Sequence, residues 1–306
     1  MRRLLIVSFV AALVAAPALA GEKEGWYVGI EGSSLQSGNS DMTLAVPRNT
    51  SGYPGGDAVT LDTGSGAAYK LLVGFRNAKS DCTLSFWSYD NDDDLSTSST
   101  LGFLNSLPLP DFGNDFSNTL DADGSLETSL TDLTWTRPIA TNDRSVFNWT
   151  LGLRAWSTEQ DTRAIYDMST PGSDIRIMLH NESQGAGLVA GLGAKYTLTD
   201  RVWGSTSLRM AFLTGTVDSM TTGDEFGSTY TNGVDADRNF QQTELETRIH
   251  FNVVAGLDMF IGYEYKQFDS ALEHLTFVDD VQEGSLFNDV KDLTFSGVAI
   301  GASYTF

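Results

Sequence analysis

Apolar and polar residues alternate along ten separate stretches of the chain, most of them about ten residues long. The last stretch shows the pattern most clearly, because Val298 and Ile300 fall on one face with Tyr304 and Phe306, while small residues fall on the other. Successive side chains of a β-strand point to opposite faces of a sheet, so the pattern predicts strands. The stretches are 25–35, 68–77, 81–90, 126–139, one beginning near 146, one ending near 198, 202–216, 241–252, 257–267 and 297–306.

The connections between these stretches alternate in length. Long polar segments follow the first stretch and lie at 91–125, 157–182, 218–239 and 269–290. Short segments lie between them at 78–80, 140–145, 199–201 and 252–256. Outer-membrane barrels show this alternation, with long extracellular loops and short periplasmic turns. The chain is therefore predicted to be all-β, a single closed antiparallel transmembrane β-barrel of ten strands with both termini in the periplasm.

One long connection is expected to continue as a hairpin above the membrane. Arg163 and Ile165 lie on its outgoing arm, and Ile175 and Ile177 return opposite. Residues 170–173 read Thr-Pro-Gly-Ser between the two arms, which is a turn signal.

The first residues predict secretion. Arg2 and Arg3 precede an apolar run at 4–16, and Ala18-Leu19-Ala20 supplies the small residues of a cleavage site. We expect residues 1–20 to be a signal peptide and residues 21–306 to form the barrel in the outer membrane of a Gram-negative bacterium. No later stretch has the roughly 18 uninterrupted apolar residues of a membrane-spanning helix.

Charge and cysteine content exclude several classes of partner. The formal net charge is −21, so the basic face that nucleic acid requires is not expected. The acidic residues concentrate in the polar segments, as in the run at 90–94. Cys82 is the only cysteine, which excludes an internal disulfide and a cysteine-based metal site. No cofactor is expected.

Charged residues on the polar faces of the strands are the first candidate site, because those faces line the lumen. They form either a charged constriction that filters solutes or a salt-bridged plug that closes the interior. A ten-strand lumen is only slightly wider than an eight-strand lumen, which side chains can fill, so both readings stay open. The candidates are Lys70, Arg76, Asp132, Arg154, Lys195, Arg209, Glu244, Glu246, Arg248, His250, Glu264 and Lys266.

The histidines are the second candidate site. Ten-strand barrel proteases, the omptins, use a His–Asp pair at the extracellular rim, and His180 and His274 are expected near that rim, close in sequence to Asp174, Asp269 and Asp279. No omptin motif is present. A serine-based lipid-modifying site has no support either, because no spacing between histidine and serine stands out. We therefore expect no enzyme activity and no catalytic residues.

The acidic run at 90–94 is the third candidate. It begins like an oxygen-ligand calcium loop but lacks the glycine and the closing glutamate of that motif. The sequence therefore predicts a solvated loop and no defined metal site, with loose binding of divalent cations beside lipopolysaccharide as the open alternative.

Two resemblances extend this interpretation. The ending with Tyr304 and Phe306 resembles the terminal strand that outer-membrane proteins present to the barrel-assembly machinery. The chain as a whole resembles the Legionella major outer-membrane-protein family of pore-forming barrels, through GWYVGIE at 25–31, LGLR at 151–154, GAGLVAGLG at 185–193 and FSGVAIG at 295–301. That family implies a pore without catalytic residues. The chain departs from its cysteine-rich members, so cross-linking by disulfides between molecules is not expected.

The function predicted from the sequence is a narrow pore for small solutes or ions. The alternative is a non-conducting surface barrel that binds or adheres through acidic extracellular loops, and the third reading is a protease or lipid-modifying enzyme at the rim. Expected partners are outer-membrane lipid and lipopolysaccharide, the barrel-assembly machinery and small solutes, and the expected state is a monomer.

Overall fold

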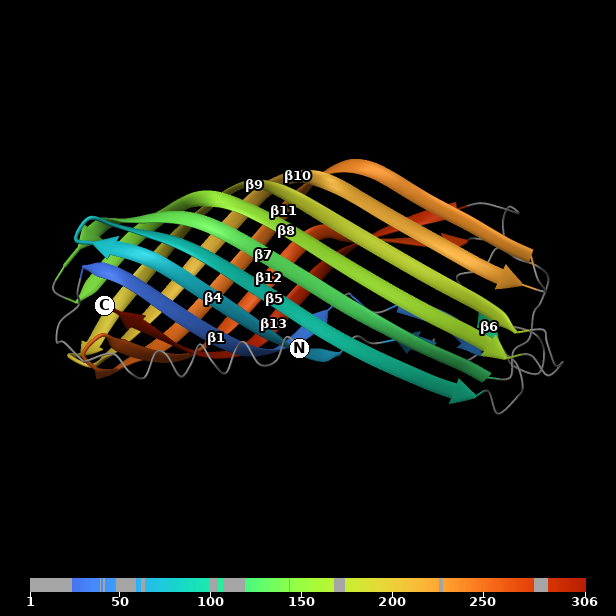
Figure 1. The fold of residues 1–306 in the computed structure, drawn as a ribbon, viewed down its shortest axis with the longest axis horizontal. Helices are drawn as coiled ribbons and strands as arrows, with labels where there is room; N and C mark the ends of the chain where they lie inside the picture. Colours follow the sequence, from blue (N-terminus) through green and yellow to red (C-terminus); the bar gives the residue numbers. More distant parts are fainter. Residues whose placement is uncertain are drawn as a thin grey trace.

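The computed structural model describes residues 24–38, 40, 42–47, 59–61, 64–98, 104–106, 119–142, 144–167, 174–225, 228–277 and 286–306. Within these residues ten antiparallel strands close into one barrel in the order β1-β13-β12-β11-β10-β9-β8-β7-β5-β4, as Figure 1 shows. The predicted barrel and its strand count are confirmed. The barrel strands are β1 (Gly25–Gly38), β4 (Ser65–Asn77), β5 (Ser80–Ser98), β7 (Thr119–Thr141), β8 (Ser145–Asp167), β9 (Ile175–Thr199), β10 (Val202–Glu225), β11 (Ser228–Val254), β12 (Leu257–Phe277) and β13 (Leu286–Thr305). The predicted signal peptide lies outside the described residues.

One end of the barrel carries the short connections, and we call it the turn end. The two residues Ala78–Lys79 join β4 to β5, and the pairs Thr141–Val146, Thr199–Val202 and Val254–Leu257 close the other three turns. The beginning of β1 lies beside the end of the chain there, where the Phe306 amide donates to the Trp26 carbonyl. All four predicted short turns are therefore confirmed.

The opposite end, called the hairpin end, differs from the prediction. Strands β5, β7, β8, β9, β10 and β11 run past the ends of β1 and β4 (Figure 1). Their pairing continues to Ser98 opposite Thr119, Tyr166 opposite Ile175, and Glu225 opposite Ser228. The hairpin predicted at 163–177 is confirmed, with its turn residues 170–173 outside the described part of the chain. The loop predicted over 218–239 is wrong, because β10 and β11 fill nearly all of it.

The reason is an inversion of the alternation along each long strand. Near the turn end, apolar side chains such as Leu153 and Leu188 point outward, where they are more than half exposed. Toward the hairpin end the outward side chains become polar and the inward ones become apolar, as Leu126 and Val217 show. Apolar outward positions identify a membrane strand in the sequence, so the pattern does not distinguish these polar-outward halves from loops.

The outward apolar side chains form a band around the turn-end half of the barrel. Leu133, Leu192, Phe212 and Ile261 belong to it, and each is exposed to at least two fifths of its surface. Such a ring is stable against lipid tails and not against water, so the barrel spans a membrane. Tyr304 differs from the expected outward pattern, since only 7% of it is exposed and its ring packs against that of Phe306. Among the described residues no helix could cross a membrane.

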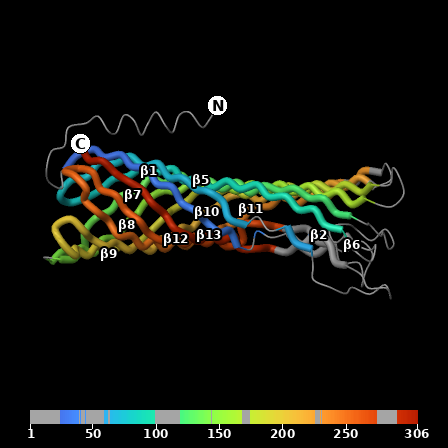
Figure 2. The backbone as a smooth tube through the Cα atoms, turned by 90° about the horizontal axis from the view of Figure 1, so that it is seen from below, coloured from blue at the N-terminus to red at the C-terminus, as the bar shows by residue number. Residues whose placement is uncertain are grey.

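A second, small sheet fills the inside of the hairpin end. Its strands β2 (Met42–Pro47), β3 (Val59–Leu61) and β6 (Leu104–Ser106) pair in the order β3-β2-β6. Figure 2 shows β2 and β6 at this end of the molecule. Leu44 and Leu61 are fully buried against apolar residues of β7, β8 and β9, and the Tyr166 hydroxyl donates to the Leu44 carbonyl at 2.8 Å. Side chains of the small sheet thus occupy the interior of the hairpin end.

Candidate functional site

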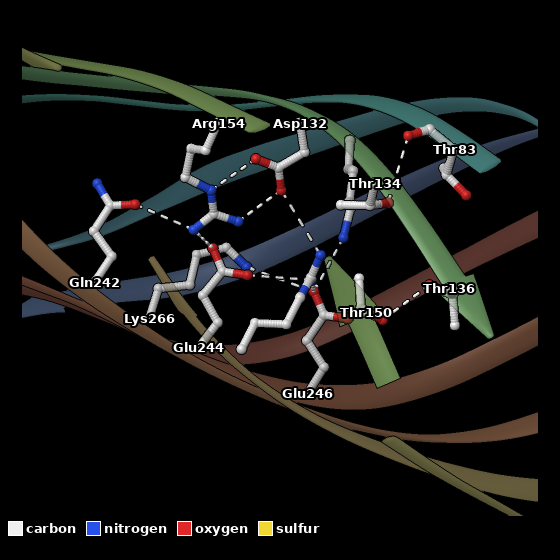
Figure 3. A network of polar contacts seen from close by, with 12 residues as sticks. Thr83, Asp132, Thr134, Thr136, Thr150, Arg154, Gln242, Glu244, Glu246 and Lys266 are labelled. Carbon is white, nitrogen blue, oxygen red and sulfur yellow. Dashed lines mark hydrogen bonds and ion pairs between the residues drawn. The ribbon is translucent and has the colours of Figure 1, made fainter. Parts of the chain in front are cut away.

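Most of the predicted lumen charges meet in one buried network inside the barrel, and Figure 3 shows part of it. Arg154 of β8 lies at its centre, with 1% of its side chain exposed. Its guanidinium donates to both carboxylate oxygens of Asp132, at 2.7 and 2.6 Å, and lies 2.6 Å from Glu244 Oε1. Gln242 Oε1 accepts a fourth contact at 3.1 Å. The network is therefore built across the lumen, from β7 and β8 to β11.

The register places a second arginine against the same acids. Arg209 of β10 stands opposite Glu244 of β11, and its Nη2 lies 3.2 Å from Glu244 Oε2 and 2.6 Å from Glu246 Oε1. Lys70 of β4 reaches Glu246 from the far wall at 3.0 Å. Glu246 thus joins β4 and β10, which are not neighbours in the barrel.

The remaining members complete the network. Arg248 lies 2.8 Å from Glu31 and 3.1 Å from Glu246, and Lys266 lies 2.6 Å from Glu264. Glu31 of β1 was missed as a lumen charge, although it stands between the outward positions Ile30 and Gly32 and the alternation of β1 therefore points it inward.

The network is electrically balanced. It contains five basic and five acidic side chains, so its formal charges cancel. A buried charge without a partner is costly, whereas pairs with several contacts each offset much of their desolvation. The geometry is that of a self-neutralised plug. The members are Glu31, Lys70, Asp132, Arg154, Arg209, Glu244, Glu246, Arg248, Glu264 and Lys266.

Apolar side chains close the lumen on the hairpin side of this network, and we call them the aromatic layer. Five aromatic rings follow one another across the barrel, each in contact with the next. The distances between ring centroids are 5.0 Å for Phe240 and Trp156, 5.6 Å for Trp156 and Phe268, 5.8 Å for Phe268 and Phe295, and 4.6 Å for Phe295 and Tyr89. They belong to one buried apolar cluster to which all ten barrel strands contribute. Among the described residues, these buried side chains fill the lumen at this level.

Three of the predicted lumen residues lie instead at the turn end. Arg76 pairs with Asp81 at 2.8 Å and is half exposed, and Lys195 places its ammonium 4.0 Å from the centre of the Trp203 ring. The imidazole of His250 stacks on the same Trp203 ring, and the two ring centroids are 3.4 Å apart. Adjoining cavities of about 350 and 540 Å³ occupy this end, beside a third of about 570 Å³.

The sequence did not reveal the partners of His250. Its Nε2 lies 3.0 Å from the hydroxyl of Ser205, and its Nδ1 lies 2.7 Å from Asp258 Oδ2. The three residues are 45 and 8 positions apart in the chain. They belong to the neighbouring strands β10, β11 and β12, so only the register of the barrel brings them together.

The rim histidine of the prediction lies on the outer surface of the hairpin end. His180 stands opposite Asp161, and its Nδ1 is 2.7 Å from Asp161 Oδ1. The hydrogen bond to Asp161 raises the pKa of His180, and burial together with nearby Asp161 raises the pKa of Glu159. Asp161, Glu159 and His180 are the described residues whose geometry could hold a metal ion. The side chain of His274 and all of Asp279 lie outside the described residues.

The acidic run at 90–94 is part of β5 and not of a loop. Register links Asp90 to Glu127, and the row continues across the sheet through Glu159, Glu182 and Asp218 to Asp235. Six carboxylates on six neighbouring strands thus form one row on the outer surface, which we call the acidic row.

Comparisons with known proteins show the fold and no more. No family model matches the chain, and no curated protein matches it either. Among solved structures, it is similar to the outer membrane protease OmpT from Escherichia coli, with 11% identity and a TM-score of 0.50 over 94% of this chain and 99% of that one. The P. putida toluene transporter TodX is less similar, with 7% identity and a TM-score of 0.35 over 97% of this chain and 92% of that one. Ail, the attachment invasion locus protein of Yersinia pestis, has 12% identity and a TM-score of 0.26 over 93% of this chain and 100% of that one. The fold is that of outer-membrane β-barrels.

Proposed function

We propose that this chain is a closed, non-conducting outer-membrane barrel that acts at the cell surface by binding a cationic partner. The observation that carries the first half is the buried apolar cluster to which every barrel strand contributes. An ion crossing that cluster would exchange most of its hydration for contacts with apolar side chains, which is costly. The second of the two functions predicted from the sequence is therefore the better supported.

The charged network supports the same conclusion. In a wet pore, charged side chains face water and passing solutes. Here every carboxylate of the network pairs with at least one cation, and Asp132, Glu244 and Glu246 each contact two or more. Groups so paired have little capacity left to select ions. The resemblance to the Legionella pore family stays a prediction, and a closed interior argues against its implied function.

The acidic row supports the second half of the proposal. Outer-membrane barrels keep their short turns in the periplasm, which puts the hairpin end outside the cell. Glu159 lies six residues beyond Leu153 on β8, about 20 Å along the strand at roughly 3.3 Å per residue. Like charges directly opposite one another destabilise a sheet. A partner that brings positive charge relieves this repulsion, so we propose a basic polypeptide as the ligand.

Conductance tests the closed state. We expect the purified protein in a planar lipid bilayer to show no channel activity under conditions in which a general porin conducts. Trp156→Ala removes a ring from the middle of the aromatic layer and is expected to let ions leak. Steady ion-selective conductance of the wild-type protein contradicts the closed barrel and favours the pore.

Binding of poly-lysine to the protein in lipid vesicles tests the surface role. Glu159→Gln together with Glu182→Gln removes two charges from the acidic row and is expected to weaken binding and lower its dependence on salt. The matched control, Glu24→Gln with Asp200→Asn, removes two charges at the turn end and should bind as the wild type does. Equal binding by both variants contradicts the role of the acidic row.

A further inference from the structure

We infer that Ser205, His250 and Asp258 form a hydrolytic triad at the turn end of the lumen, where short-chain carboxylic esters are cleaved. A nucleophile, a base and an orienting acid within hydrogen-bond reach of one another define such a triad whatever their order in the chain. The distances here are 3.0 Å from the Ser205 hydroxyl to His250 Nε2 and 2.7 Å from His250 Nδ1 to Asp258. This departs from the expectation that the protein has no enzyme activity, and it does not depend on the proposed surface function.

The contacts of His250 favour the tautomer that a general base needs. The carboxylate of Asp258 can only accept, so Nδ1 carries the proton and donates to it. Nε2 is then free to accept the proton of the Ser205 hydroxyl. The Trp203 ring lies parallel to the imidazole, at an interplanar angle of 8°, and the Phe260 ring packs 5.3 Å away. These rings hold the imidazole in the plane that joins the serine to the aspartate.

The cavities give the serine a place for a substrate. Ser205 lines the cavity of about 540 Å³, and His250 and Asp258 line the adjoining cavity of about 350 Å³. Asn77 at the end of β4 and Ala78 of the following short turn border the larger cavity, so it is reached from the periplasmic side. The charged network bounds the smaller cavity through Arg209, Glu246 and Arg248, so a substrate enters and leaves by the same end.

Two side chains that carry donor groups also line the larger cavity. Lys195 stands opposite Ser205 in the pairing of β9 with β10, and Asn148 of β8 lines the same cavity. An ammonium and a side-chain amide near the reacting carbon stabilise the oxyanion of an ester under attack. Because the cavity beside Ser205 holds only about 540 Å³, the substrate class is a short acyl ester and not a whole lipid.

The reaction balances with water as the only co-reactant. The Ser205 oxygen attacks the carbonyl carbon while its proton passes to His250 Nε2. Collapse of the tetrahedral species breaks the ester bond, and the imidazolium gives its proton to the leaving alcohol. Water then attacks the acyl-serine with His250 again taking and returning a proton, so ester and water become acid and alcohol. Asp258 is a positioning residue throughout, because it acts on the substrate only through His250.

Labelling with a fluorophosphonate probe and hydrolysis of p-nitrophenyl acetate test the triad, using the full barrel in detergent. We expect the probe to modify Ser205, as located by peptide mass spectrometry, and Ser205→Ala to abolish both labelling and turnover. The control Ser157→Ala removes a hydroxyl from the outer surface of β8 and should react as the wild type does. Heat-dependent migration on a gel shows whether each variant is folded.

Asp258→Asn separates positioning from a structural role. It should slow hydrolysis by roughly 100-fold or more and alter the pH dependence of the rate, while the barrel stays folded. Three outcomes overturn the proposal: a wild-type barrel that neither labels nor hydrolyses, a label on a serine other than Ser205, or a folded Ser205→Ala that is as active as the wild type. If Ser205→Ala does not fold, the site of labelling in the wild type decides.

Discussion

Replacing Arg154 with alanine tests how dry the interior is. The change removes the bidentate contact with Asp132 and the ion pair with Glu244, and it leaves those two buried acids with Arg209, at 3.7 and 3.2 Å. The network changes from neutral to one net negative charge. Breaking one partner of a buried pair costs about 3–5 kcal/mol. We expect the free energy of unfolding to fall by about that amount.

Urea unfolding in lipid vesicles, followed by tryptophan fluorescence, measures this loss. Arg76→Ala is the matched control, because the Arg76 side chain is 49% exposed and its pair with Asp81 should contribute less than about 1 kcal/mol. Adding Glu244→Gln to Arg154→Ala restores the balance of formal charge, so the double variant should be less destabilised than the single one. If Arg154→Ala loses no more than Arg76→Ala, the lumen is hydrated and the closed-barrel reasoning is refuted.

Three further predictions follow from other parts of the barrel. Trp156→Ala should lower stability by about 3–5 kcal/mol in the same urea assay, because it leaves a cavity in the aromatic layer. Leu192→Arg places a charge in the lipid-facing band and should lower the free energy of unfolding by roughly 2–4 kcal/mol, whereas the control Leu192→Ile should leave it nearly unchanged. NMR titration should give His180 a pKa above its ordinary value, and Asp161→Asn should lower it. The His180–Asp161 pair therefore stabilises the fold at low pH and loses this effect as pH rises through the raised pKa; an unchanged pKa in Asp161→Asn contradicts the contact.

The barrel could be predicted because a membrane imposes a strict rule on the outward face. Apolar residues at alternate positions, such as Leu151 and Leu153, predict both the strand and which of its faces contacts lipid. Above the membrane that rule ends, and the outward face carries acidic residues such as Glu127 and Glu159. The length of the hairpins was missed for this reason, since water accepts polar residues on strands and loops alike.

The site was predictable residue by residue but not as an arrangement. Inward charges such as Arg154 and Glu246 followed from alternation alone. Whether they pair or line a pore depends on the stagger between strands that are far apart in sequence, such as β4 and β11, which join Lys70 to Glu246. The same stagger sets Ser205 beside His250 across 45 positions, a separation that no local motif reports.

The inversion of alternation along the long strands also bears on how this protein can change. Surface loops of a barrel ordinarily tolerate inserted residues, because their backbone is solvated and touches little else. Here Ala164 and Ile177 are fully buried in the hairpin end, and a one-residue insertion before either would turn every following side chain to the opposite face. Insertions and inserted epitopes are therefore expected to be poorly tolerated on the flanks of the hairpins, whose inward side chains are as constrained as the core of a soluble protein, whereas outward positions such as Glu159 can still be substituted.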